Sequence, residues 1–330
     1  MNLRLTLRLA ALAQAVALVW LASGTPFAQT RAAAAPRTPW GDPDLQGTYT
    51  NTYEASTPFE RPDQFAGRRL EDIKGEELAR TRLAIQERTI GQFLGPVHAP
   101  DHWWQANLEL DKGSQAWLVT DPADGRIPPL TAEAVRRNQE RAAARKASGR
   151  GPADSYTDRS LYDRCITRGL PGSMLPAIYG NQFEIVQAPG IVSIRYEMIH
   201  EARVIPIGPA AARTRAVVPQ HMGTARGWWE GDTLVVETVG FRDESAYRNA
   251  NGATLKLTER FARIAPDTAF PQARVRWTVT VEDPQTWTRP WTFSLPLTAD
   301  DHPVPSYECH EGNYGLANIL SAARAEERQK

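Results

Sequence analysis

Hydrophobic and polar residues alternate along most of the second half of the chain. From residue 182 onward, short runs with a period of two are separated by turn residues, which is typical of β-strands with one buried face. Ala188-Pro189-Gly190 is one such turn, and Gly231-Asp232 is a tight hairpin signal. The pattern predicts strands over residues 182–187, 191–200, 226–230, 233–241, 253–264, 273–282 and 288–297, with a further strand at 44–51.

This many strands joined by short connections favour an antiparallel meander. We therefore expect a mainly β fold, either an antiparallel β-barrel or a strongly curved sheet, lipocalin-like in general shape, with a few peripheral helices. One β-rich domain is expected over residues 38–330. Its first part, 38–160, is irregular and partly helical, and its second part, 161–330, forms the barrel.

Three segments carry helix-like patterns, at residues 68–92, 131–146 and 316–326. Thr131 is a candidate N-cap for the second of them. That segment is also rich in arginine and could contact an anionic partner, although a solvated helix explains the same pattern.

Three ionisable residues fall on the apolar faces of predicted strands. Side chains at positions i and i+2 of a strand share a face, so a polar residue in phase with the apolar ones points towards the core. The residues are His200 in strand 191–200, Glu259 in strand 253–264 and Arg289 in strand 288–297.

Two explanations compete for these residues, because burying an ionisable group is costly unless it is paired or lines a wet cavity. The structural explanation is an internal ion pair between Glu259 and Arg289, with His200 at a strand end near solvent. The functional explanation is a cavity inside the barrel in which Glu259 or His200 transfers protons.

Cofactor-independent acid–base chemistry is the enzymatic class that the motifs leave open. The sequence has no G-x-G-x-x-G, Walker A, G-x-S-x-G, H-E-x-x-H or C-x-x-C-H pattern, so we expect no cofactor and no metal, short of distant histidines converging. The candidate catalytic residues are His200 and Glu259 as bases, and His221 and His310 as acids. Arg289 and Arg164 are candidates for holding an anionic or carbonyl group.

The stretch "GPVHAPDHWWQ", residues 95–105, is expected to form a loop over the barrel. His102, Trp103 and Trp104 could close over a cavity or stack on a ligand there. The alternative is a loop that its tryptophans simply pin to the barrel.

The N-terminus has the order of a secretory signal peptide. Arg4 and Arg8 precede an apolar run at residues 9–22, and a small-residue stretch follows it. We expect a signal peptide at residues 1–28, cleaved near Ala28, and a flexible segment at 29–37; an uncleaved anchor is the alternative. The expected location is periplasmic or secreted.

An oxidising compartment changes how the two cysteines are interpreted. Cys165 and Cys309 are the only cysteines in the chain. In such a compartment an isolated pair favours a disulfide over a catalytic thiol.

The charges balance at 38 basic and 38 acidic residues, which gives no electrostatic reason to expect nucleic acid or an anionic membrane as partner. We expect a small-molecule ligand and no stable membrane insertion. The leading function is a lyase, isomerase or hydrolase acting on a small, partly apolar or aromatic molecule in a barrel cavity. A non-catalytic periplasmic binding protein for a hydrophobic ligand is the alternative, and a surface-interaction module using the tryptophan loop is a third.

Several stretches together resemble a large family of secreted, mostly uncharacterised bacterial proteins. They are "PWGDPDLQGTY", "DPADGRIPPLT", "LYDRCITRGLPG", "RGWWEGDTLVVETVGF", "DPQTWTRPW" and "YECHEGNY", and they span nearly the whole predicted mature chain. The resemblance implies no particular activity. It implies that the two cysteine segments occur together, which agrees with a disulfide.

Overall fold

One large antiparallel sheet dominates the computed structural model, which describes residues 36–93, 109–177, 179–209, 218–266, 268 and 271–329. Within these residues nine strands follow one another in the order β5-β4-β3-β1-β10-β9-β8-β7-β6, and β2 pairs with β10 outside this path. The strands are β1 (Gly47–Thr50), β2 (Val119–Asp121), β3 (Gln182–Ala188), β4 (Ile191–Tyr196), β5 (Ala202–Pro206), β6 (Thr224–Glu230), β7 (Thr233–Val239), β8 (Lys256–Ile264), β9 (Arg274–Glu282) and β10 (Trp291–Ala299).

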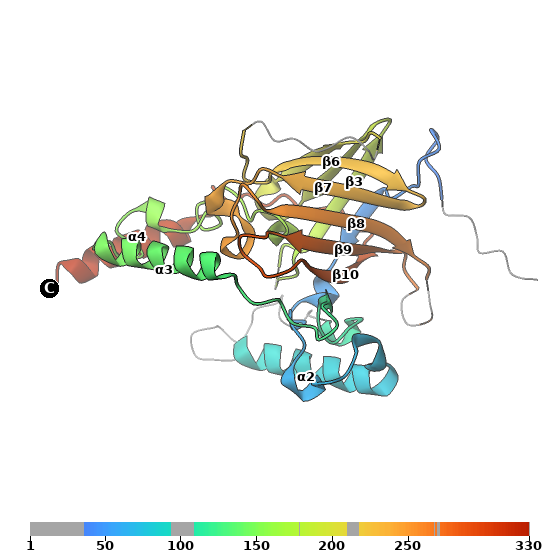
Figure 1. The fold of residues 1–330 in the computed structure, drawn as a ribbon, viewed down its shortest axis with the longest axis horizontal. Coiled ribbons are helices and arrows are strands. Elements are labelled where there is room, and N and C mark those ends of the chain that lie inside the picture. The colour runs from blue at the N-terminus through green and yellow to red at the C-terminus, as the bar shows by residue number, and fades with distance from the viewer. Residues whose placement is uncertain are drawn as a thin grey trace, which may run out of the picture. The chain divides into compact units, whose positions relative to one another are not determined.

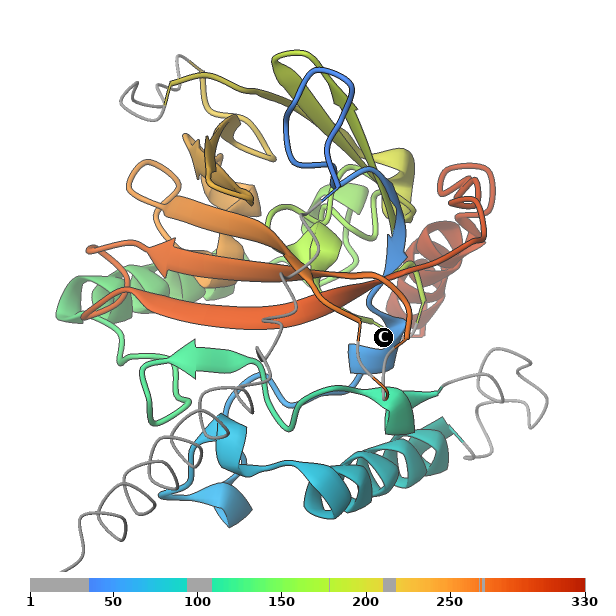
Figure 2. The same ribbon diagram turned by 90° about the vertical axis from the view of Figure 1, so that its right-hand side faces the viewer.

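The sheet curls until its first and last strands meet. Ile207, just after β5, bridges to Gly227 in β6, and the Gly208 amide donates to the Gly227 carbonyl at 3.0 Å. We call this junction the β5–β6 seam. The result is a nearly closed barrel, as Figures 1 and 2 show, and the predicted mainly β fold is confirmed.

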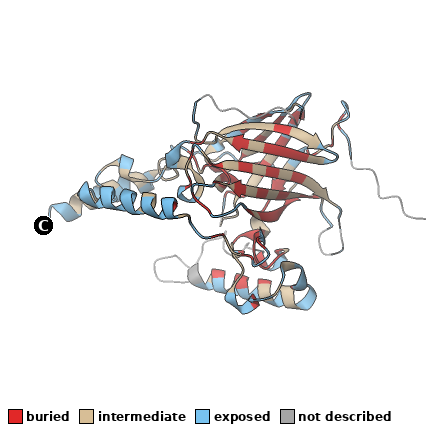
Figure 3. Ribbon diagram, viewed as in Figure 1, coloured by how far each residue is buried: buried red, intermediate tan, exposed pale blue. Residues whose placement is uncertain are grey.

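The alternation read from the sequence sets which side chains fill the barrel. In β8, Leu257, Glu259 and Phe261 are fully buried, as the pattern predicted. The aromatic and aliphatic residues of the neighbouring strands β9 and β10 continue this core, and the strands are the most deeply buried part of the chain in Figure 3. Burying one such large apolar side chain stabilises the fold by about 1.5–3 kcal/mol, so this core carries most of the stability.

Three helices lie outside the barrel in the described part of the chain: α2 (Gly75–Phe93), α3 (Ala132–Ala147) and α4 (Tyr314–Glu327). Thr131 caps α3 as predicted, because its hydroxyl accepts from the Ala134 amide at 3.1 Å. In the same way the Asn313 side chain caps α4 by accepting from Leu316. Helix α2 begins later than its pattern suggested, since residues Leu70–Asp72 form a short 3-10 turn first.

Two of the differences between predicted and observed strand bounds displace a candidate site residue. The strand predicted at 191–200 ends at Tyr196, because Met198–His200 form a 3-10 turn in which Ile199 and His200 have positive φ angles of 62° and 55°. The strand predicted from residue 288 begins only at Trp291. Strands β2 and β5 were not predicted at all.

One end of the barrel is covered by residues 160–177 and 179–181, which we call the end segment. Its Leu170 and Met174 belong to the barrel core. The Asn51 side-chain amide donates to the Met174 carbonyl at 2.7 Å, and the Ser173 hydroxyl donates to Glu201 at 3.1 Å. The end segment is thus fixed to the ends of several strands at once.

The predicted disulfide is confirmed. Cys165 in the end segment is bonded to Cys309, and their Cα atoms are 5.8 Å apart. The bond attaches the chain before α4 to the covered end of the barrel. No helix among the described residues has the length and apolarity needed to cross a bilayer. The predicted signal peptide lies outside the described residues.

Candidate functional site

The barrel interior contains a buried ion pair, and Glu259 is one half of it. Its partner is Arg203 of β5, which donates to the two carboxylate oxygens at 2.5 and 2.8 Å. The indole of Trp277 donates a third hydrogen bond to Glu259 at 3.0 Å. Because these donors satisfy the carboxylate from two sides, the arrangement is that of a structural cross-tie between β5 and β8.

The surroundings of Arg203 favour its charged form. Burial lowers the pKa of this guanidinium, but the charge of Glu259, the hydrogen bonds to Glu259 and the adjacent Tyr196 together outweigh burial, and the pKa of Arg203 is raised. Burial raises the pKa of neighbouring Tyr196, whose phenol therefore stays neutral. Arg203 remains a cation at any physiological pH.

The expected partner of Glu259 was wrong. Arg289 lies in the exposed turn before β10 and not on the apolar face of that strand. His200 is also exposed: its Nε2 lies 3.1 Å from the Ser306 hydroxyl and accepts from the Tyr307 amide at 3.1 Å. Glu259, His200 and Arg289 therefore do not share one cavity.

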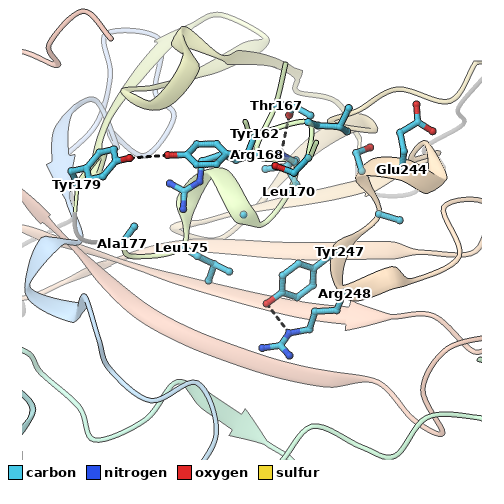
Figure 4. A pocket seen from close by; sticks show the side chains of 16 residues that line it. Tyr162, Thr167, Arg168, Leu170, Leu175, Ala177, Tyr179, Glu244, Tyr247 and Arg248 are labelled. Atoms are coloured by element: carbon cyan, nitrogen blue, oxygen red, sulfur yellow. Dashed lines mark hydrogen bonds between the residues drawn. The ribbon is translucent and has the colours of Figure 1, made fainter. Parts of the chain in front are cut away.

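A cavity of about 600 Å³ lies instead at the covered end of the barrel, and we call it the end cavity. Figure 4 shows its lining side chains. They come from the end segment and from the turn after β7. The lining residues that carry polar or aromatic chemistry are Ser160, Tyr162, Thr167, Arg168, Tyr179, Glu244, Ser245, Tyr247 and Arg248.

Tyrosine hydroxyls gather on one side of the end cavity. The oxygens of Tyr162 and Tyr179 are 3.3 Å apart. The ring of Tyr179 stacks on that of Tyr307, with centroids 6.4 Å apart, so the "YECHEGNY" segment supports the wall of the cavity. Burial raises the pKa of Tyr162 and of Tyr307. Both phenols are therefore neutral hydrogen-bond donors at physiological pH.

Arg168 brings a positive charge to the same side. Its guanidinium carbon lies 5.5 Å from the centre of the Tyr162 ring, a cation–π distance. Its Nη1 is buried and has no hydrogen-bond partner among the described residues. A buried donor without a partner costs about 1–3 kcal/mol, which a bound anion would recover.

A second arginine lies across Leu175 from the tyrosines (Figure 4). Arg248 donates from Nε to the Tyr247 hydroxyl at 3.2 Å, and its guanidinium carbon is 4.7 Å from the centre of the Phe59 ring. Arg248 has a positive φ of 53°, an unfavourable conformation for a residue with a side chain. Tyr247 in turn packs against Trp291 of the core, with ring centroids 6.2 Å apart.

The remaining predicted site residues lie elsewhere. Arg164 stacks over the ring of Tyr156 at 5.4 Å and lines a neighbouring cleft together with His221. His310 is exposed. His102, Trp103 and Trp104 lie outside the described residues. No group of three or more histidine, cysteine, aspartate or glutamate side chains within the described ranges is arranged to hold a metal ion.

Sequence reasoning missed the residues that line the end cavity, because most of them lie in irregular segments that have no periodicity. The available signal was the density of tyrosine and arginine around Cys165, in "LYDRCITRG". An expected disulfide fixes the position of this stretch, so the polar side chains beside Cys165 become candidates for lining a binding site.

No family model matches the chain, and neither a curated protein nor a solved structure matches it. The resemblance to secreted bacterial proteins therefore stays a prediction.

Proposed function

We propose that the protein binds a small organic anion with an aromatic or apolar body in the end cavity. The observation that carries this proposal is the buried Nη1 of Arg168, which has no hydrogen-bond partner among the described residues and lies beside the hydroxyl pair of Tyr162 and Tyr179. A carboxylate on Arg168 would accept charge-assisted hydrogen bonds, and the Tyr162 and Tyr179 hydroxyls could donate to the same group. Leu170 and Leu175 offer an apolar surface to the rest of the ligand.

The size of the end cavity agrees with this ligand class. About 600 Å³ falls within the usual range for small-molecule sites, which combine a largely apolar lining with a few placed polar groups. An exported location, expected from the N-terminal sequence, is part of the proposal. The disulfide supports it, because such bonds persist mainly in oxidising compartments.

Benzoate and its uncharged analogue benzamide test the anion site by calorimetric titration. Arg168→Gln should weaken benzoate binding about tenfold or more, since a hydrogen bond to a charged group contributes about 1.5–3 kcal/mol. Benzamide binding should change much less. Arg195→Gln is the matched control, because Arg195 lies on β4 in a half-exposed pair with Glu184. Equal benzoate affinity in Arg168→Gln and wild type would refute the assignment.

Acid–base catalysis in the end cavity is the second candidate function. It is favoured by the hydroxyl pair of Tyr162 and Tyr179 beside Arg168, because a neutral phenol next to a cation is placed to protonate an oxygen of a bound anion. In this role Arg168 orients the ligand, Tyr162 donates a proton to its carbonyl oxygen, and solvent water takes up the proton that leaves the adjacent carbon. No cofactor is needed for such a step.

The keto–enol interconversion of phenylpyruvate, an aromatic keto acid, tests the acid by absorbance. Tyr162→Phe should lower the enzymatic rate about 100-fold, the usual lower scale for a general acid, while benzoate affinity and melting temperature stay near wild type. A wild-type rate equal to that of buffer would leave binding as the function. A loss of melting temperature alone in Tyr162→Phe would make the residue structural.

A further inference from the structure

A second cavity, of about 1300 Å³, adjoins the end cavity, and we call it the arginine cleft. It is lined by α3, by the chain that follows it up to Ile166, and by the turn after β7. Six arginines and four acidic residues face it. Its surface is therefore strongly polar, in contrast to the tyrosine-lined end cavity.

All four acidic residues of the arginine cleft are already engaged. Each carboxylate has a nitrogen of one lining arginine within ion-pair distance. The pairs are Arg150–Asp158 at 2.7 Å, Arg242–Glu244 at 2.7 Å, Arg159–Asp163 at 3.0 Å and Arg141–Asp243 at 3.7 Å.

Two arginines of the cleft remain without a carboxylate partner among the residues that the structure describes. They are Arg145 on α3 and Arg164 in the end segment, which lies over the face of the Tyr156 ring. The hydrogen bond from its paired arginine lowers the pKa of Asp158 and the charge of Arg145 adds to this effect, but Arg145 itself makes no ion pair among the described residues. Arg141 precedes Arg145 by four positions, so both project from the same face of α3. The cleft thus has an excess of positive charge that comes from two separate elements.

His221 adds an independent indication of a ligand. It lines the arginine cleft, and its Nδ1 is buried with no hydrogen-bond partner in the described part of the chain. Most buried polar atoms in native proteins are hydrogen-bonded, and an unpaired one is explained by strain, by a functional role or by a bound water or ion.

We propose that the arginine cleft is a second binding site, for a small molecule that carries two or more phosphate or carboxylate groups. Guanidinium groups bind both kinds of anion through paired hydrogen bonds. One anionic group would be held by Arg145 and a second by Arg164, with His221 as a further polar contact. Several anionic groups are required because the two free arginines belong to different elements.

This site goes beyond the proposed function, since it uses other residues and another ligand chemistry. Ser160, Leu161 and Glu244 line both cavities, so a single wall separates the two ligands. Benzoate binding to the end cavity is therefore an internal control for the integrity of every arginine-cleft variant.

Calorimetric titration of the full chain with pyrophosphate, citrate and inorganic phosphate at 0.15 M salt tests the proposal. We expect pyrophosphate or citrate to bind at least tenfold more tightly than phosphate. The two ligands distinguish phosphate from carboxylate preference. The double variant R145Q/R164Q should bind pyrophosphate or citrate at least tenfold more weakly than wild type and should keep benzoate binding. His221→Gln should weaken pyrophosphate or citrate binding by a smaller factor.

Arg136→Gln is the control for charge alone. Arg136 also lies on α3 and is exposed like Arg145, but it is paired with Glu133 and Glu140 and does not line the cleft. The affinity of the Arg136→Gln variant for pyrophosphate and citrate should stay within about twofold of the wild-type affinity. The proposal is overturned if neither ligand binds the wild-type protein, if R145Q/R164Q binds like wild type, or if Arg136→Gln loses as much as the double variant.

Discussion

Glu259 shows how a buried charge is accommodated in this barrel. Its carboxylate accepts three hydrogen bonds, two from Arg203 and one from Trp277, and no part of it reaches solvent. Taking two charges out of water is costly, so the pair adds little net stability over an apolar packing. Removing one partner alone destabilises the fold strongly, because it leaves the other charge buried without compensation.

The variant Glu259→Gln should lower the free energy of unfolding by about 3–5 kcal/mol, the usual cost of breaking a buried ion pair. Urea denaturation followed by tryptophan fluorescence measures it. The double variant Glu259→Leu/Arg203→Met should recover most of the loss, since it removes both charges.

The exposed pair of Arg195 and Glu184 is the matched control, and Glu184→Gln should cost no more than about 1 kcal/mol. A similar small cost for Glu259→Gln would contradict the cross-tie interpretation.

At the scale of single residues, the sequence predicted a buried Glu259 but not its partner. Leu257 and Phe261 flank Glu259 at a spacing of two, so its direction followed from the alternation. Arg203 lies in a strand of five residues with only Arg203 and Ile205 pointing inward, which is too short a repeat to detect. His200 was misplaced because a turn with two positive φ angles ends the strand early, and alternation does not reveal such backbone geometry.

At the scale of elements, helix α3 was predictable together with its start, because Thr131 directly before it is a recognisable N-cap residue. Helix α2 is held differently, by the fully buried Arg82. The Nε of Arg82 donates to the Leu110 carbonyl at 2.8 Å, and its Nη1 lies 3.8 Å from a carboxylate oxygen of Glu54. Burial lowers the pKa of Arg82. No periodic pattern distinguishes this arginine from the exposed ones on the same helix.

Asn313 has two roles at the start of α4. Its oxygen accepts from the Leu316 amide, and its nitrogen donates to the Asp163 carbonyl of the end segment at 2.8 Å. Asn313→Ala should therefore destabilise the first turn of α4 by about 1 kcal/mol. Hydrogen exchange of the amides at 314–317 should become roughly fivefold faster, because about 1 kcal/mol changes the opening equilibrium by that factor. Asn318→Ala, within the exposed part of α4, should leave these rates unchanged; equal effects would exclude the cap.

At the scale of the whole molecule, the number and alternation of strands were enough to predict a barrel, while its closure was not predictable. Closure depends on β5, which is short and follows an irregular turn, and on one bridge between Ile207 and Gly227. The end cavity also arises only after folding, when the end segment covers the barrel. Contacts between distant irregular segments leave no periodic trace in the sequence.

The disulfide closes a loop of 144 residues and links the barrel end to the chain before α4. Replacing Cys165 and Cys309 by serine should lower the free energy of unfolding by about 2–5 kcal/mol, because a large loop is no longer constrained in the unfolded chain. Urea denaturation measures the loss. The intact wild-type protein should gain two hydrogens in mass on reduction, and an unchanged mass would show that the bond is absent.

The β5–β6 seam has fewer backbone hydrogen bonds than the neighbouring strand pairs of the barrel. Among the described residues, its backbone pairing consists of one bridge and the Gly208 amide, and the Arg203–Glu259 pair is a side-chain tie across it, whereas the neighbouring strands are hydrogen-bonded along their whole length. A Cβ atom at residue 227 would lie 2.7 Å from Ile207 Cδ1, so a side chain at this position would displace Ile207 from the seam. We therefore expect β5 and β6 to separate transiently at the seam more often than any other pair of neighbouring strands. The interior beside Arg203 would then open transiently through the wall of the barrel, independently of the end cavity.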